Sequence, residues 1–196
     1  MPPLSEILNA LIGAYHLAWR DTAGYQFFNN TVEGFWRSFT AALVVAPMLF
    51  ILATPESALQ AELDAARGEA ADAGVNYARM AVALALDWIS YPIVMVFVAR
   101  ALNLSHRYAL YIIALNWSAV LILAALNVPL ILFWAGIVGA TTTVAMNFLL
   151  LFPALYYRWF IALTALDTNG PTAAGLVVME FAIGLLVLRA TLWMFG

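Results

Sequence analysis

The chain has 196 residues, of which 65% are hydrophobic and only 10% are charged. Soluble domains are about 45–50% apolar and roughly 25% charged, so this composition excludes an ordinary soluble domain and predicts an integral membrane protein. A formal net charge of -3 offers no basic surface for nucleic acid, and the lack of cysteine excludes disulfides and thiolate chemistry. Long apolar segments indicate helices, because a segment in lipid must satisfy its own backbone hydrogen bonds. We therefore expect an all-α, polytopic helix bundle in the lipid bilayer.

Residues 1–30 are expected to form an amphipathic interfacial helix followed by a polar connector. The apolar face of this helix carries Leu4, Ile7, Leu8, Leu11, Ile12, Tyr15 and Trp19. The opposite face is mostly polar, and two placements fit the pattern. The helix either lies in the membrane interface or packs across the mouth of the bundle.

Residues 31–196 are expected to form a five-helix transmembrane domain. The spans are predicted at about 32–53, 77–102, 106–126, 129–152 and 172–195. Each is long enough for a hydrocarbon core of ~30 Å at 1.5 Å per residue. We expect Pro55 to end the first span, and Asn127-Val128-Pro129 to form the turn before the fourth. Beyond Pro153, residues 154–166 either continue the fourth helix or lie in the interface.

Segment 56–74 is rich in alanine and acidic residues, and we expect it to form a solvated helix outside the cytoplasm. Its acidic residues are Glu56, Glu62, Asp64, Glu69 and Asp72, against the single Arg67. Good helix formers dominate the segment, which favours a helix over a loop. A cation site among these carboxylates is the alternative to a solvated acidic face.

The arginines predict the orientation, since short loops rich in arginine stay in the cytoplasm. One face of the predicted bundle has Arg20, Arg37, Arg100, Arg107 and Arg158, and the other has Arg67 and Arg79. The chain has no lysine, and together with its abundant alanine this is typical of a GC-rich bacterial genome. We expect a bacterial inner (cytoplasmic) membrane protein with its N-terminus in the cytoplasm and its C-terminus outside.

Three ionisable residues fall inside predicted spans and are candidate functional residues, because charge at membrane depth is costly. Asp87 and Arg189 lie roughly 15 Å and 10 Å from the same face, counted at 1.5 Å per residue, so we hypothesise that they pair. Glu180 lies roughly 12 Å from the opposite face. Its candidate partners are Arg37, Arg100, Asn116 and Asn147, the alternative being a protonated, neutral side chain.

Asn116 and Asn147 lie near the middle of their predicted spans and also need partners. His16 and His106 are isolated, with no second ligand at the spacing of a metal site. The sequence contains no motif of a nucleophilic, metal-dependent or nucleotide-binding enzyme. We therefore expect no enzyme activity, no cofactor and no metal.

The sequence Asp87-Trp88-Ile89-Ser90-Tyr91-Pro92 is followed by an apolar run, a short turn and further hydrophobic hairpins. In this order it resembles the Yip1-type membrane domain, in outline over residues 75–195. The resemblance implies five helices, a cytoplasmic N-terminus and a role in binding partner proteins. It carries over no functional residue.

These features predict a non-enzymatic, multi-pass inner-membrane protein that is an accessory or scaffold subunit of a larger complex of integral membrane proteins. The alternative is a small proton- or cation-coupled transporter or channel that uses Glu180 and Asp87. A transporter needs a water-lined path from one of these carboxyl groups to a surface, whereas a scaffold needs an apolar flank covered by another protein.

Overall fold

The computed structural model describes residues 2–69 and 74–195, and within them it contains helices and turns but no strand. The long helices are α3 (Ala41–Arg67), α4 (Tyr77–Ala101), α5 (Tyr108–Trp134), α6 (Ala140–Ala165) and α7 (Gly170–Phe195). Shorter elements are α1 (Leu4–Ala18), η1 (Thr22–Phe27), α2 (Val32–Ser38) and η2 (Ser105–Arg107). Five helical segments are long and apolar enough to cross a membrane, the first being α2 together with α3. The prediction of an all-α fold with five such segments is confirmed.

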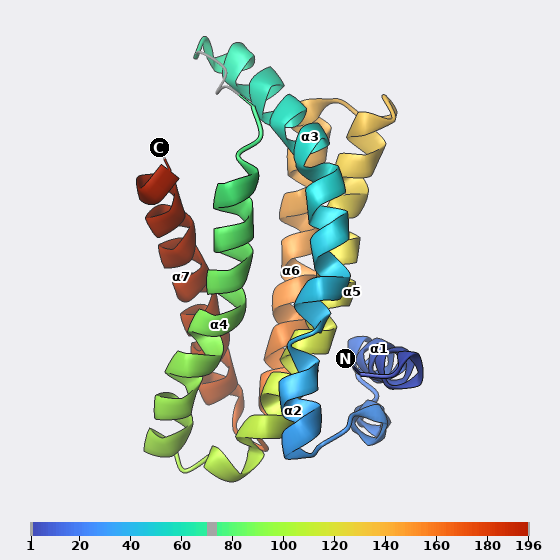
Figure 1. Ribbon diagram of the computed structural model, residues 1–196, viewed down its shortest axis with the longest axis vertical. Helices are drawn as coiled ribbons and strands as arrows, with labels where there is room; N and C mark the ends of the chain where they lie inside the picture. The colour runs from blue at the N-terminus through green and yellow to red at the C-terminus, as the bar shows by residue number, and fades with distance from the viewer. Residues whose placement is uncertain (1, 70–73, 196) are drawn as a thin grey trace.

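The long helices run side by side, and the bundle has two distinct ends (Figure 1). The end with α1, α2 and the α4–α5 turn is called the N-terminal end below. The end where α3 and α7 finish is called the C-terminal end. α5 is the central helix and packs on α3 and α6, and every residue from Tyr111 to Ala119 is buried. α4 packs mainly on α7 and has few contacts with α3.

Side-chain caps and one glycine explain several helix ends. The hydroxyl of Thr31 accepts a hydrogen bond from the Gly34 N–H at 3.0 Å, and the side chain of Asn76 accepts one from the Arg79 N–H at 2.9 Å. These bonds satisfy backbone donors at the starts of α2 and α4. At the end of α3, Gly68 has a φ of 75°, the left-handed conformation that glycine adopts without strain.

α1 lies crosswise on the flank of the bundle near its N-terminal end (Figure 1). It turns small residues, among them Ala10 and Ala14, towards α5 and α6, and the Tyr157 hydroxyl donates a 2.6 Å hydrogen bond to the Ala14 carbonyl. The outward face carries Leu4, Leu8, Ile12, Tyr15 and Trp19, all exposed. The helix is therefore packed against the bundle and still presents an apolar stripe outwards, as an interfacial helix does.

The first span extends further than the sequence indicated. We expected Pro55 to end it, but α3 continues through Pro47 and Pro55 to Arg67 and leans across the C-terminal end towards α4 (Figure 1). The acidic segment predicted as a separate helix over 56–74 is the last part of α3 up to Arg67. Asp72, counted among its acidic residues, lies outside the described residues.

The predicted boundary between the third and fourth spans is wrong. α5 runs through the expected turn at Asn127-Val128-Pro129 and ends at Trp134, so the next helix covers Ala140–Ala165 rather than 129–152. The Asn127 side chain donates to the Leu123 carbonyl within the same helix, at 2.7 Å, instead of capping a new one. Pro153 is accommodated inside α6, and residues 154–165 continue this helix.

Candidate intramembrane polar site

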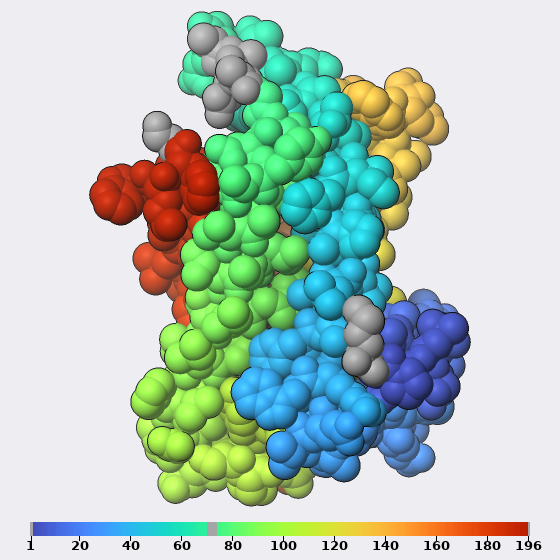
Figure 2. All heavy atoms as spheres, in the orientation of Figure 1, coloured from blue at the N-terminus to red at the C-terminus, as the bar shows by residue number. Residues whose placement is uncertain are grey.

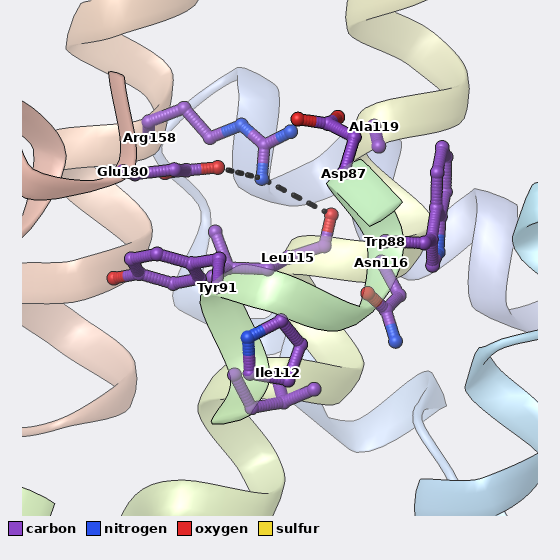
Figure 3. A pocket seen from close by; sticks show the side chains of 10 residues that line it. Asp87, Trp88, Tyr91, Ile112, Leu115, Asn116, Ala119, Arg158 and Glu180 are labelled. Atoms are coloured by element: carbon purple, nitrogen blue, oxygen red, sulfur yellow. Dashed lines mark hydrogen bonds and ion pairs between the residues drawn. The ribbon is translucent and has the colours of Figure 1, made fainter. Parts of the chain in front are cut away.

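Three charged side chains from three helices meet inside the bundle. Asp87 projects from α4, Arg158 from α6 and Glu180 from α7 (Figure 3). Nη1 of Arg158 lies 3.0 Å from Oε1 of Glu180, and it also donates to the Leu115 carbonyl of α5 at 3.4 Å. Asp87 lies on the other side of the guanidinium group from Glu180 (Figure 3).

These side chains line a cavity of about 50 Å³. The remaining lining residues are Trp88, Tyr91, Pro92, Ile112, Leu115, Asn116 and Ala119. A water molecule needs roughly 10–15 Å³ when volume is measured this way, so the cavity has room for a few waters or one small ion. It is too small for a larger organic solute.

The charges of the site do not balance. With both carboxyl groups ionised, Asp87 and Glu180 carry two negative charges against one positive charge on Arg158. The side chains of Arg158 and Glu180 are only 19% and 22% exposed, so water cannot fully screen this excess. One bound proton or one bound monovalent cation neutralises the site.

The two carboxyl groups are offset along the bundle. Asp87 lies in the half of α4 nearer the C-terminal end, and it is exposed. Glu180 lies in the half of α7 nearer the N-terminal end, and it is half-buried. The site therefore has one accessible acid and one enclosed acid, with the arginine between them.

Tyrosines pack beside the charged groups on the side of the N-terminal end. The hydroxyls of Tyr91 and Tyr111 lie 2.6 Å apart, and both side chains are buried. The Tyr108 hydroxyl donates to the Pro92 carbonyl at 2.9 Å. These bonds join α4 to α5 between the cavity and the N-terminal end of the bundle.

The sequence-based pairing of Asp87 with Arg189 is wrong. Arg189 is exposed on α7, and within the part of the chain that the structure describes it forms no ion pair. Glu180 is paired, but with Arg158 rather than with Arg37, Arg100, Asn116 or Asn147. Arg37 instead bonds Glu6 at 2.7 Å, and Arg100 is exposed at the N-terminal end.

The two candidate asparagines have different surroundings. Asn116 lines the cavity, and its Nδ2 donates to the Ser38 hydroxyl at 2.9 Å, which links α5 to α2. Asn147 lies elsewhere in α6, and its buried Oδ1 has no hydrogen-bond partner among the described residues. Of the five predicted candidates, the structure brings Asp87, Glu180 and Asn116 together and leaves Asn147 and Arg189 apart.

Sequence reasoning missed the role of Arg158. It placed this residue at the interface because Pro153 was expected to break or bend the helix. Instead, α6 continues through Pro153 and carries Arg158 into the bundle, where it lines the cavity. The signal available in the sequence was charge balance: two carboxyl groups inside predicted spans required a cation, and Arg158 was one of few choices.

The histidines take part in local contacts only. Nδ1 of His16 lies 2.7 Å from Oδ2 of Asp21, and this contact, together with the Ala23 N–H, lowers the pKa of the Asp21 carboxyl. His106 is exposed in η2. Across residues 2–69 and 74–195, no three histidine or acidic side chains gather as metal ligands.

The fold and the site define an all-α protein with five potential membrane spans and a compact polar centre between them. No protein-family model, no curated protein and no solved structure matches the chain.

Proposed function

We propose that this protein spans the membrane five times and binds one proton or one small monovalent cation at Asp87 and Glu180, as part of a transport function. One observation carries the proposal: two carboxyl groups share one cavity with a single arginine. An uncompensated charge at membrane depth is expensive, so the site favours uptake of one positive charge. An exchangeable positive charge of this kind is what a proton- or cation-coupled carrier requires.

Arg158 sets the stoichiometry of this proposed binding. Its guanidinium group carries one positive charge and offsets one carboxylate. The remaining carboxylate then exchanges the proton or cation. Asp87 is the more exposed of the two acids, and this supports its assignment as the group that exchanges with water.

Proteoliposomes test the proposal directly. The purified protein is reconstituted with a trapped pH dye, and a potassium diffusion potential drives protons inward; a sodium gradient replaces the proton drive in a parallel experiment. We expect flux from the natural protein that is lost in both Glu180→Gln and Asp87→Asn. The matched control is Glu62→Gln, which removes an exposed acid of α3. Equal flux in natural and Glu180→Gln vesicles for both ions overturns the proposal.

A second candidate function is that of an accessory or scaffold subunit in a larger membrane complex. It is supported by Arg189, an exposed arginine on the outer face of α7 beside the exposed apolar residues Leu185, Leu186 and Leu192. A lipid-facing arginine is costly unless it reaches the headgroups or a partner helix offers an acid. Purification in mild detergent with mass spectrometry tests this. If the protein is an accessory subunit, another membrane protein should co-purify with the natural chain and should be lost from the Arg189→Gln variant. Purification of the chain without a partner contradicts this function.

The orientation proposed for this membrane protein has its N-terminus in the cytoplasm of a bacterial cell. Arg20, Arg37, Arg100 and Arg107 lie at the N-terminal end of the bundle, which supports that placement. Arg158 no longer contributes to this count, because it lies inside the bundle. We propose that the protein acts without enzyme activity.

A further inference from the structure

A second, larger cavity opens at the C-terminal end of the bundle. It is a cleft of about 600 Å³ between the last part of α3, the start of α4 and the last part of α7. Its polar lining residues are Glu56, Ser57, Gln60, Asp64, Asn76, Arg79 and Thr191. Figure 2 shows α3 and α4 side by side, with a narrow gap between them about half-way along the bundle. The other lining residues are apolar, and charged side chains at membrane depth usually face the bundle interior or a water-filled cavity.

One face of α4 connects this cleft to Asp87. Asn76, Met80 and Ala83 line the cleft, and Asp87 follows them at the spacing that keeps residues on one side of a helix. Trp88 and Tyr91, which follow, are buried and line the cavity of the polar site. Asp87 is therefore the next group along the wall of the cleft, one helical turn beyond Ala83.

The facing wall is one side of α7. Leu188 and Thr191 line the cleft, and Gly184 and Glu180 continue the same face towards the polar site. A Cβ atom placed on Gly184 would lie 3.7 Å from Oδ1 of Asp87. Gly184 therefore lies directly beside the Asp87 carboxyl group, with no side chain of its own between them.

Towards the N-terminal end, the site is closed by packed side chains. Tyr91, Met95 and Ala99 of α4 are buried, and so are Tyr111 and Ile112 of α5. The hydrogen bond between Tyr91 and Tyr111 adds to this closure. These packed side chains separate the acids from the N-terminal end of the bundle.

From these observations we infer that the cleft is a water-filled vestibule through which protons or small monovalent cations reach Asp87 from the C-terminal end in this conformation. The identity of the ion rests on the proposed function. The vestibule itself does not, because water access can be measured without any flux.

The absence of cysteine from the chain makes cysteine accessibility a direct test. Ala83→Cys places a thiol on the wall of the cleft, and Ala85→Cys places one on the exposed face of the same helix at nearly the same depth. Methanethiosulfonate reagents react with the thiolate, which forms in water and not in lipid. We expect Ala83→Cys to react with a membrane-impermeant reagent faster than Ala85→Cys, by a factor on the order of ten or more.

Two reference variants show from which side of the membrane the reagent reacts. Glu62→Cys marks the C-terminal end of the bundle, and Ser105→Cys marks the N-terminal end. The inference requires Ala83→Cys to be labelled from the side that labels Glu62→Cys. An Ala83→Cys thiol that reacts only after denaturation, or only from the side of Ser105→Cys, overturns it. Labelling after denaturation also shows that each thiol is present.

A pair of substitutions at Gly184 tests the connection between the vestibule and the site. Gly184→Ala places its methyl group at ordinary contact distance from Asp87 and should preserve flux, whereas Gly184→Leu fills the connection and should abolish it. Flux that persists in Gly184→Leu overturns the route.

If Ala83→Cys is labelled as expected but the natural protein moves no ion, the vestibule stands and the transport proposal fails. If ions move but Ala83→Cys is protected, transport stands and the vestibule fails.

Discussion

Nη1 of Arg158 lies 3.0 Å from Oε1 of Glu180, and this ion pair joins α6 to α7 inside the bundle. The two partners are not equivalent. A carboxyl group that loses its partner can take up a proton and become neutral, but a guanidinium group cannot lose its charge. The arginine is also the only cation that balances the two acids of the cavity. The stability of the site should therefore respond differently to loss of the arginine and loss of either acid.

A double-mutant cycle at this pair is the first prediction. Arg158→Gln leaves two neighbouring acids without a cation, and Glu180→Gln leaves the arginine facing Asp87 alone. We expect Arg158→Gln to lower the free energy of unfolding by about 3 kcal/mol, and the Arg158→Gln/Glu180→Gln double variant to recover part of that loss. Thermal unfolding in detergent, followed by tryptophan fluorescence, measures all four proteins. Strictly additive effects would contradict a direct interaction.

The two asparagines give the second prediction. Asn116→Leu removes the 2.9 Å bond to the Ser38 hydroxyl and should lower the free energy of unfolding by about 1 kcal/mol. Asn147→Leu is the matched substitution. Because the Asn147 Oδ1 is buried without a partner among the described residues, its loss should be neutral or stabilising. The same unfolding assay compares them, and an equal loss in both variants contradicts the assignment.

The sequence predicted the five spans because each needs only a long apolar run, which composition reveals directly. The ends of the helices were misplaced because Pro55, Asn127 and Pro129 were interpreted as residues that end or start a helix, as they often do in soluble proteins. Helices in an apolar environment tolerate such residues, and α3 and α5 continue through them. The turn before α6 lies instead around Gly136, whose φ is 71°.

The third prediction concerns the close contact between α1 and η1. A Cβ atom on Gly24 would collide with the carbonyl oxygen of Gly13, so Gly24→Ala must push the two segments apart. We expect a loss of about 1–3 kcal/mol and faster trypsin cleavage after the exposed Arg20, which lies between them. Gly175→Ala is the control, since open space surrounds that position in α7. Cleavage at the same rate in both variants contradicts the tight contact.

The fourth prediction is a pH dependence from Tyr25, which lies outside the spans in η1. Its hydroxyl bonds Thr164 Oγ1 at 2.6 Å, and burial raises the pKa of the phenol to about 12. The unfolded chain releases this proton near pH 10, so the neutral phenol contributes stability below about pH 10 that is lost progressively as the pH rises towards about 12. Two pKa units correspond to at most about 3 kcal/mol.

Tyr25→Phe isolates this contribution from the other tyrosines. The difference in unfolding free energy between the natural protein and Tyr25→Phe should be constant below about pH 9 and should shrink towards about pH 12. Thermal unfolding across this range measures the difference. A difference that does not change with pH shows that the Tyr25 phenol titrates normally.

Arg158 shows how far the functional centre was predictable. Asp87 and Glu180 were found because a charge at membrane depth is conspicuous in any apolar run. Their partner was missed because the choice among arginines depends on where α6 ends and on which way its residues face. Both depend on packing between helices distant in sequence. An error in one helix boundary therefore gave the wrong ion pair.

The last prediction is the orientation of the chain. Ser105→Cys lies in the exposed turn between α4 and α5, and Glu62→Cys on the exposed side of α3 at the opposite end. Because the arginine-rich end should stay in the cytoplasm, an impermeant thiol reagent should label Glu62→Cys in intact cells and Ser105→Cys only after permeabilisation. The natural protein, which has no cysteine, is the blank. The reverse pattern places the vestibule on the cytoplasmic side and makes Asp87 accessible from within the cell. Labelling of both positions in intact cells contradicts a crossing of the membrane by α4, the one span between them.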